Sequence, residues 1–96
     1  MIRSFGDTAT EDLFHGTNSK AARKIPKNLW AAVRRKLDLV NAATSVKALA
    51  VPPGNRLEAL LGDRAGSFSI RMNDHYRITF RFEDEHAHDV TCEDYH

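Results

Sequence analysis

Apolar residues along the chain follow a helical period in the first half and an alternating one in the second. The helical period is clearest where apolar side chains recur every three or four positions, at Leu29, Val33, Leu37 and Val40. Pro26 and Asn28 both suit the start of a helix, so we expect the longest helix to begin there. A shorter helix is predicted to start at a cap on Asp7 or Thr8 and to run to about His15.

Short segments lie before and between these helices. Residues 1–5 alternate enough for a short N-terminal strand, and residues 16–20 have the composition of a turn. Thr44 is expected to cap a helical turn over residues 46–49. The following Pro52-Pro53-Gly54 must end that turn, because proline lacks a backbone donor and restricts the residue before it.

From residue 56 onward the period becomes two, which indicates β-strands. The predicted strands cover residues 56–60, 67–72, 75–82 and 86–93, joined by a loop at 62–66 and by turns at 73–74 and 83–85. The fold class we predict is α+β: a short N-terminal strand, two helices and a four-stranded, mainly antiparallel meander with the helices packed on one face. We expect a single domain spanning 1–96, because a chain of this length is enough for one core.

The strand predicted at 75–82 has an apolar and a polar face. Tyr76, Ile78, Phe80 and Phe82 are expected to point inward, and His75, Arg77, Thr79 and Arg81 outward. Arg64 and Arg71 add to the polar face, where guanidinium groups repel each other unless an anion binds among them. The planar fork of arginine suits phosphate oxygens, so this face is predicted to bind phosphate. The alternative is that Arg71 and Arg81 pair with surface acids such as Glu83 or Glu93.

Charge is unevenly distributed, although the net charge is only +1. Residues 1–60 hold ten Lys and Arg against five Asp and Glu, whereas residues 61–96 hold four against eight. The stretch 20–36 has seven basic residues and no acidic one, which is typical of a surface that contacts phosphates or an acidic partner. A solvated helix face is the alternative explanation for this stretch.

Several classes of function are excluded by the remaining residues. Cys92 is the lone cysteine, so no internal disulfide can form, and no apolar run approaches the roughly 20 residues that span a bilayer. We expect a cytoplasmic protein with no membrane role. His86 and His88 share a strand face, but no Cys or carboxylate completes a recognised zinc spacing, so neither a metal nor a cofactor is predicted.

One set of residue types suits cleavage of RNA without a metal. That reaction needs a base to take the proton of a 2′-hydroxyl, a cation to stabilise the charged phosphorane and an acid to protonate the leaving oxygen. Glu58, Arg77, Tyr95 and His96 could fill these roles. An extended chain end would put Tyr95 and His96 on opposite faces, so the chain must turn at its end for both to act.

Three stretches of the chain are specific in combination: Gly62-Asp63-Arg64, residues 69–80 (SIRMNDHYRITF) and the terminal Glu93-Asp94-Tyr95-His96. With them the chain resembles the HigB toxins, a branch of the RelE/ParE superfamily of bacterial toxin–antitoxin modules. The resemblance covers nearly the whole length of the chain.

This resemblance implies a toxin that enters the decoding site of the 70S ribosome and cuts the messenger RNA in the A site, leaving a 2′,3′-cyclic phosphate. It also implies a HigA-like helix-turn-helix antitoxin as the inhibitor. The toxin–antitoxin complex would repress its own operon, so operator DNA is contacted only through the antitoxin. Ribosomal RNA would bind the basic stretch 20–36, which includes Lys24, Lys27, Arg34 and Arg35.

Matching positions carry over roles from the family. Arg77 matches the strand arginine at the scissile phosphate, and Asp94-Tyr95-His96 matches the catalytic tail. Arg64 and Arg71 match basic positions near the groove. These residues are therefore expected to form one site.

Two positions depart from the family pattern. Glu58 stands where many HigB proteins have histidine, and related toxins use a glutamate there as a proposed base. The base would be Glu58 or His96, and the acid Tyr95 or His96. Leu61 stands where a lysine usually precedes the Gly-Asp-Arg motif. The loss of this cation is expected to slow cleavage, to increase the reliance on Arg64 or to alter codon preference.

A rival hypothesis keeps the fold and omits the chemistry. The chain would then be a ParE-like inhibitor of DNA gyrase, or a subunit that only binds the antitoxin and regulates the operon. The terminal Tyr95-His96 argues against it, because a protein that only binds has no need of a proton-transfer pair at its end.

Overall fold

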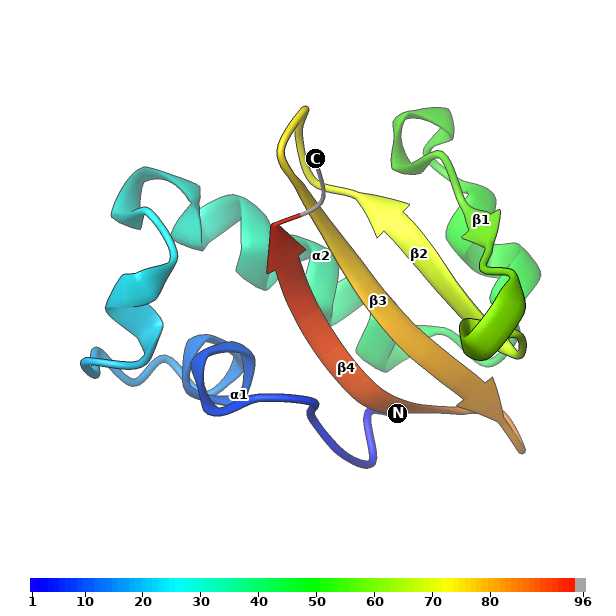
Figure 1. Ribbon diagram of the computed structural model, residues 1–96, viewed down its shortest axis with the longest axis horizontal. Helices are drawn as coiled ribbons and strands as arrows, with labels where there is room; N and C mark the ends of the chain where they lie inside the picture. Colours follow the sequence, from blue (N-terminus) through cyan, green and yellow to red (C-terminus); the bar gives the residue numbers. More distant parts are fainter. Residues whose placement is uncertain (95–96) are drawn as a thin grey trace.

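The computed structural model of this protein describes residues 1–94, and Tyr95 and His96 lie outside the described residues. Within residues 1–94, the α-helices are α1 (Thr8–Phe14) and α2 (Trp30–Ala42), and the strands are β1 (Glu58–Ala59), β2 (Ser67–Arg71), β3 (Tyr76–Glu83) and β4 (His86–Asp94). The connecting segments contain short 3₁₀ helices: η1 (Ala22–Lys24), η2 (Lys27–Leu29), η3 (Val46–Ala50), η4 (Pro53–Asn55) and η5 (Gly62–Arg64). The strands form an antiparallel sheet in the order β1-β2-β3-β4 (Figure 1).

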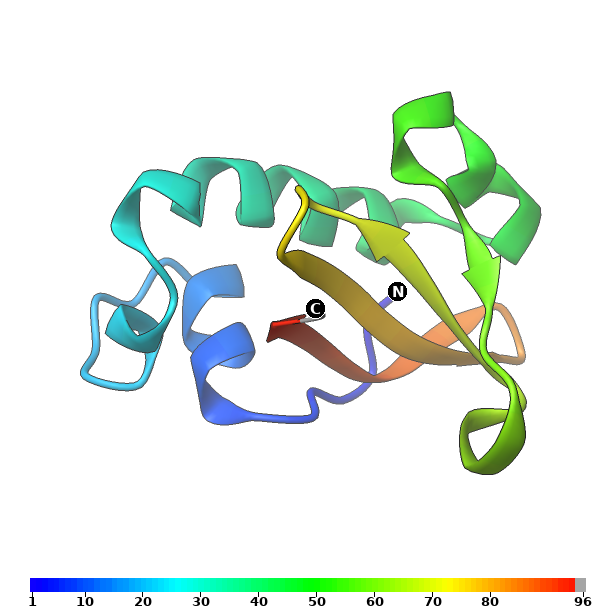
Figure 2. The same ribbon diagram turned by 45° about the horizontal axis from the view of Figure 1, so that its top comes forward.

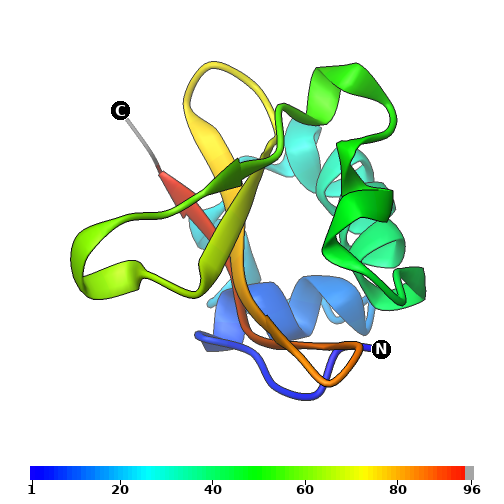
Figure 3. The ribbon, with the colours of Figure 1, turned by 90° about the vertical axis from the view of Figure 1, so that its right-hand side faces the viewer.

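Both α-helices lie on the same side of the sheet (Figure 3). The longer one, α2, runs along this side (Figure 2) and buries Val33, Leu37 and Val40 in the core. Ile70 of β2 and Ile78 of β3 are fully buried in the same cluster. The predicted α+β fold, a meander with helices packed on one face, is therefore confirmed.

The shorter helix, α1, lies beside the edge strand β4. Asp7 caps α1, since its Oδ1 accepts a hydrogen bond from the Thr10 amide at 2.9 Å, so the cap is Asp7 and not Thr8. The buried Thr10 hydroxyl then accepts from the Cys92 amide of β4, also at 2.9 Å. This contact covers part of an edge that would otherwise present unpaired backbone groups.

The N-terminal segment differs from the predicted strand. Residues 1–5 make two isolated parallel bridges to β4, Ile2 with Ala87 and Phe5 with Val90, and no regular strand. Asp89 interrupts the pairing, because its backbone is left-handed (φ 54°) and its amide donates to the Ser4 hydroxyl. The same left-handed residue lies where the β3–β4 register shifts, which is typical of a β-bulge.

Two helix starts were also predicted at the wrong residue. α2 begins at Trp30, because residues 27–29 form the 3₁₀ helix η2 and not the first turn of the α-helix. Ser45, and not Thr44, caps η3: the Ser45 backbone is extended and its hydroxyl accepts from the Ala48 amide at 3.3 Å. An extended residue with a hydroxyl is what a helix start requires.

The strand predicted at 56–60 is shorter than expected. Arg56 has a left-handed backbone (φ 45°), which breaks the extended run and leaves β1 with Glu58–Ala59 alone. The other three strands agree with their predicted ranges to within one residue at each end. In the part of the chain that the structure describes, no helix is both long and apolar enough to cross a membrane.

Candidate functional site

The sheet face opposite the α-helices carries most of the predicted site residues. We call it the helix-free face; its side chains come from Glu58, Ser69, Arg71, Arg77, Thr79 and Glu93. Strand pairing arranges them in two rows across the sheet: Glu58, Ser69 and Thr79 in one, and Arg71, Arg77 and Glu93 in the other. The η5 loop and the carboxyl end of β4 project on this side of the sheet (Figure 3).

Arg77 lies at the centre of the helix-free face and is almost completely covered, with 9% of its surface exposed. Its Nε donates to the Ser69 hydroxyl at 2.8 Å, and its Nη2 donates to the carbonyl of Arg56, also at 2.8 Å. The sequence predicted the correct face for Arg77 but the wrong exposure. Ser69 is small, so the long Arg77 side chain lies over it and not out in the solvent.

The Arg77 side chain extends across β2 towards β1. There its Nη2 lies 3.8 Å from the Glu58 carboxylate, which is 58% exposed. The left-handed conformation of Arg56 places a carbonyl in reach of the same nitrogen. The structure thus brings together two predicted site residues, Glu58 and Arg77. The Glu58 carboxylate is exposed to solvent, whereas the Arg77 guanidinium is held in place by its hydrogen bonds.

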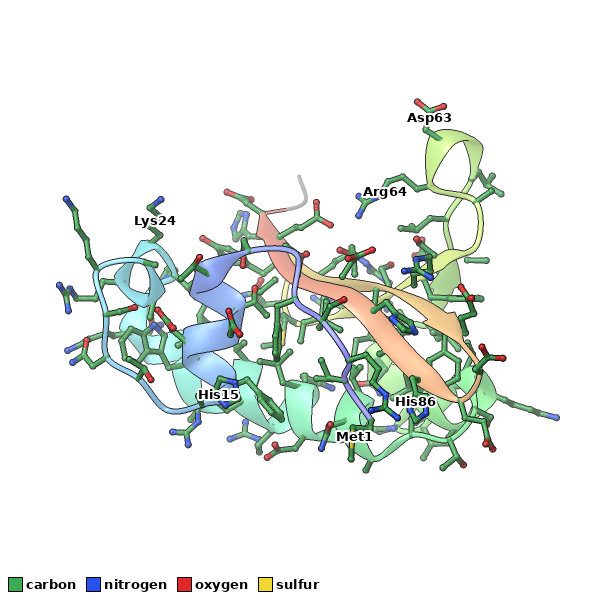
Figure 4. All side chains as sticks on the ribbon, turned by 90° about the horizontal axis from the view of Figure 1, so that it is seen from below. Met1, His15, Lys24, Asp63, Arg64 and His86 are labelled. Carbon is green, nitrogen blue, oxygen red and sulfur yellow. The ribbon has the colours of Figure 1, made fainter. Side chains whose placement is uncertain are left out.

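A second cluster joins the η5 loop to β4. Arg64 donates from Nη2 to Glu93 Oε2 at 2.7 Å and from Nη1 to Oε1 at 3.4 Å, and Figure 4 shows Arg64 pointing from the loop towards the end of β4. The Thr79 hydroxyl also donates to Glu93. Burial alone would raise the pKa of the Glu93 carboxyl, but hydrogen bonds from Arg64 and Thr79 and the charge of Arg64 outweigh it and hold that pKa below its ordinary value.

The alternative prediction, that Arg71 and Arg81 pair with surface acids, is confirmed, but Glu93 is not their partner and pairs with Arg64. Arg71 forms its ion pair with Asp74, and Arg81 donates to Glu83 at 2.6 Å. Strand parity already places Glu93 on the face of Arg77. The alternation of the strand could therefore have identified Glu93 as a site residue. It could not have identified its partner Arg64, which lies on a loop 29 positions earlier in the chain.

The predicted catalytic tail begins at Asp94, the last described residue. Asp94 pairs with Tyr76 in the register of β3 and β4, one position beyond the Glu93–Arg77 pair. Strand alternation therefore directs Asp94 away from the helix-free face. Tyr95 and His96 lie outside the described residues, so their predicted catalytic roles stay predictions.

The basic segment lies apart from the helix-free face. Lys24 and Lys27 are in the 3₁₀ helices η1 and η2, with the Lys27 ammonium 5.5 Å from the centre of the Trp30 ring. Arg34 and Arg35 are exposed on α2, on the other side of the sheet. In Figure 4 the end of β4 lies between Lys24 and Arg64. Arg34 and Arg35 therefore lie on the opposite side of the sheet from Arg77.

Among residues 1–94, no group of three or more His, Cys, Asp or Glu side chains is placed to hold a metal ion. The His86 ring, labelled in Figure 4, lies near the N-terminal segment, where its Nε2 is 3.1 Å from Arg3 Nη2. His88 pairs in register with Arg81. Within the described residues, the groups beside Arg77 are carboxylates, hydroxyls and guanidinium groups, and His88 adds an imidazole in the row of Arg81.

Sequence comparisons identify relatives over almost the whole chain. A family model described as the RelE-like toxin of the type II toxin–antitoxin system HigB matches residues 3–96. The chain is 38% identical over 84 residues to Toxin HigB-1 of Vibrio cholerae serotype O1, which covers 88% of this chain and 86% of that protein. It is 33% identical over 101 residues to Endoribonuclease HigB of Proteus vulgaris, with both chains covered completely.

Solved toxin structures have the same fold. A chain of the YoeB-YefM complex from Staphylococcus aureus aligns with a TM-score of 0.62 and 14% identity, over 100% of this chain and 98% of that one. The YoeB/ParE toxin from Agrobacterium tumefaciens aligns with a TM-score of 0.58 and 13% identity, over 99% and 100% of the two chains. At such low identity these likenesses show the fold alone.

Proposed function

The chain belongs to the HigB-like family of RelE-like toxins of type II toxin–antitoxin systems, and from this premise we propose that it is an endoribonuclease. It cuts messenger RNA in the A site of the 70S ribosome and so stops translation, without a metal ion. The observation that carries the proposal is the exposed Glu58 carboxylate 3.8 Å from the fixed Arg77 guanidinium. The name of the Proteus vulgaris relative, an endoribonuclease, supports the same reaction.

The proposed reaction is an internal attack on the RNA backbone. A base takes the proton from a 2′-hydroxyl, the 2′-oxygen bonds to phosphorus, and the bond from phosphorus to the 5′-oxygen breaks. An acid protonates that leaving oxygen, so the products are a 2′,3′-cyclic phosphate and a 5′-hydroxyl end. Glu58 or His96 is the base, and Tyr95 or His96 is the acid.

Guanidinium groups stabilise the phosphorane in this scheme. Arg77 is held by Ser69 and by the Arg56 carbonyl, so it meets the developing charge without reorganising. Arg64 contacts the same phosphate group from the η5 loop, and Arg71, next to Arg77 in the strand register, contributes to the positive potential. Asp94 belongs to the tail that brings Tyr95 and His96 to the RNA.

The basic segment binds a different part of the target in this proposal. Lys24, Lys27, Arg34 and Arg35 contact ribosomal RNA while the helix-free face contacts the messenger RNA. Because such contacts release counterions from the RNA, affinity for the ribosome should fall steeply as salt rises.

The proposed partner is a HigA-like antitoxin with a helix-turn-helix domain. Membership of a toxin–antitoxin family supports an antitoxin partner, and one of the solved relatives was determined as a YoeB-YefM complex. Operator DNA is then contacted only through the antitoxin. The toxin acts in the cytoplasm, where its ribosomal target is found.

Expression of the wild-type protein and His96→Ala in bacterial cells, followed by mapping of messenger RNA ends, tests the proposed activity. New ends should appear with the wild type and vanish with His96→Ala. His15→Ala, which changes an exposed histidine at the end of α1, is the matched control and should cut like the wild type. DNA breaks linked to gyrase, without new RNA ends, would instead favour the ParE-like function.

Purified protein tests the ribosome requirement separately. Messenger RNA should be cut rapidly when it is bound to ribosomes and poorly when it is naked. Efficient cleavage of naked RNA would contradict the ribosome-dependent part of the proposal and leave the nuclease part standing.

A further inference from the structure

The η5 loop projects from the sheet with little packing of its own. Residues 61–66 are all exposed, and Gly62 and Gly66 have left-handed backbones (φ 66° and 94°) with open space around them. The Leu60 amide closes the base of the loop by donating to the Ser67 carbonyl at 2.9 Å. A cation on such a loop has a defined position only if its side chain is tied to something rigid.

Glu93 supplies a rigid point on the sheet. It lies in the paired part of β4 directly across from Arg77, and its carboxylate accepts from the hydroxyl of Thr79, which is buried in the neighbouring strand. Arg64 then binds both oxygens of this carboxylate, from a position 29 residues earlier in the chain. Two-point contacts of this kind fix the direction of a guanidinium as well as its distance.

We propose that Glu93 is a positioning residue for RNA cleavage: it holds the Arg64 guanidinium over the helix-free face at a set place relative to Arg77. The proposal rests on the proposed nuclease function. Glu93 acts through Arg64 and does not touch the RNA. The sheet therefore orients both phosphate-binding cations, Arg77 through Ser69 and Arg64 through Glu93.

The ion pairs of Arg71 and Arg81 are more local. Arg81 pairs with Glu83 two residues away and with Asp89 across the β3–β4 hairpin, and Arg71 pairs with Asp74 three residues away. Such pairs lie within one hairpin and tie no loop to the sheet. Arg64 and Glu93 come from different elements, so their contact sets a tertiary distance.

The charge of Glu93 is consistent with this role. A glutamate is ordinarily ionised at neutral pH; burial alone would raise the pKa of Glu93, but the hydrogen bonds from Arg64 and Thr79 and the charge of Arg64 lower it further. A bare carboxylate at this place would repel an RNA phosphate. Arg64 and Thr79 offset that repulsion by donating hydrogen bonds to Glu93.

A double-mutant cycle tests whether Glu93 acts through Arg64. Cleavage of ribosome-bound messenger RNA is measured as kcat and KM for the wild type, Glu93→Gln, Arg64→Ala and the double variant. Glu93→Gln should lower kcat/KM by about 10- to 100-fold, since a misplacement of about 1 Å can cost about 100-fold. In the Arg64→Ala background the same change should have no further effect.

Two other results would overturn the proposal. Losses that multiply in the double variant would mean that Glu93 acts independently of Arg64. Faster cleavage by Glu93→Gln would mean that the carboxylate competes with phosphate for the guanidinium. Glu83→Gln, which breaks the comparable Arg81 pair, is the matched control and should cleave like the wild type.

Thr79 provides a second route if Glu93→Gln folds poorly. Thr79→Val keeps the side-chain shape but removes the hydroxyl that donates to Glu93, and should lower kcat/KM, whereas Thr79→Ser should restore it. Equal activity of Thr79→Val and Thr79→Ser would contradict the positioning role.

Nuclear magnetic resonance of the Arg64 side chain separates failure of this inference from failure of the proposed function. The Arg64 guanidinium should be ordered in the wild type and more mobile in Glu93→Gln than in the wild type. An Arg64 side chain already mobile in the wild type refutes the positioning contact, whatever the activity. A wild type that cuts no RNA on ribosomes refutes the nuclease function, and with it any catalytic role of Glu93.

Discussion

Arg77 donates from its Nε to the hydroxyl of Ser69, 2.8 Å away on the neighbouring strand. The bond is buried and joins a charged group on β3 to a fully buried serine on β2. Charged residues are seldom covered to this degree unless hydrogen bonds replace the lost water. The Arg77–Ser69 bond is therefore part of both the stability of the sheet and the orientation of the proposed phosphate-binding cation.

Ser69→Ala should destabilise the protein by about 1–3 kcal/mol, because it leaves a covered charged donor without its partner. Urea unfolding of the two proteins measures this difference. Ser67→Ala, two residues earlier on the same face of β2, is the control and should change stability by less than about 0.5 kcal/mol. A Ser69→Ala protein as stable as the wild type would show that the bond contributes little.

Glu58→Gln should slow single-turnover cleavage by about 10²–10⁴-fold if the Glu58 carboxylate is the general base. The unfolding free energy should change little, because more than half of the side chain is exposed. His96→Ala is measured in parallel. A loss confined to His96→Ala, with Glu58→Gln cleaving normally, would assign the base to His96 and exclude Glu58.

Leu61→Lys should increase cleavage, because it adds a cation beside the Gly62-Asp63-Arg64 turn. Leu61 is 85% exposed, so the change removes no core packing and should leave the unfolding free energy unchanged. One charge near a phosphate in water is worth about 1 kcal/mol, which corresponds to an increase in kcat/KM of about fivefold. Leu61→Met is the uncharged control, and an equal increase with it would rule out an electrostatic cause.

Acid should remove part of the stability that Glu93 provides. The pKa of Glu93 is lower in the folded protein than in the unfolded chain, since hydrogen bonds and the charge of Arg64 outweigh the effect of burial. Its stabilisation is therefore complete at neutral pH and is lost as the pH falls below about 4.3, the usual value for a glutamate. Urea unfolding at pH 7 and pH 3.5 should show a smaller acid-induced loss for Glu93→Gln than for the wild type. An equal acid-induced loss of stability in the wild type and in Glu93→Gln would contradict a lowered pKa of Glu93 in the folded protein.

Cys92 should resist thiol reagents in the native protein. Burial, with smaller contributions from the charges of Asp7 and Glu93, raises the pKa of the Cys92 thiol to about 12, so almost no thiolate is present at pH 8. A thiol–disulfide exchange reagent should label the protein only as urea unfolds it. The chain has one cysteine, so the signal is assigned without a variant. Rapid labelling in native buffer would contradict the burial of Cys92.

The elements that follow from local periodicity were predicted well. The alternation in residues 67–72, 75–82 and 86–93 gave strands whose ends agree closely with β2, β3 and β4, and it assigned Ile78 and Phe80 to the core and Arg77 to the opposite face. Such patterns are predictive because successive side chains of a regular strand point to opposite faces of the sheet, so an alternation of apolar and polar residues indicates which face is buried. Resemblance of the motifs also identified the HigB family, which the comparisons confirm.

Sequence alone therefore determined the faces of β2 and β3, the order of the elements and the family. Tertiary structure decided three further features: the near-complete covering of Arg77, the pairing of Arg64 with Glu93 and the parallel bridges of the N-terminal segment. Each depends on a left-handed residue or a loop that joins distant segments. Arg56 directs its carbonyl to Arg77, Asp89 interrupts the edge pairing, and η5 carries Arg64 back over the sheet. Contacts between side chains that are far apart in the sequence produce no periodic pattern, so the sequence alone could not predict them.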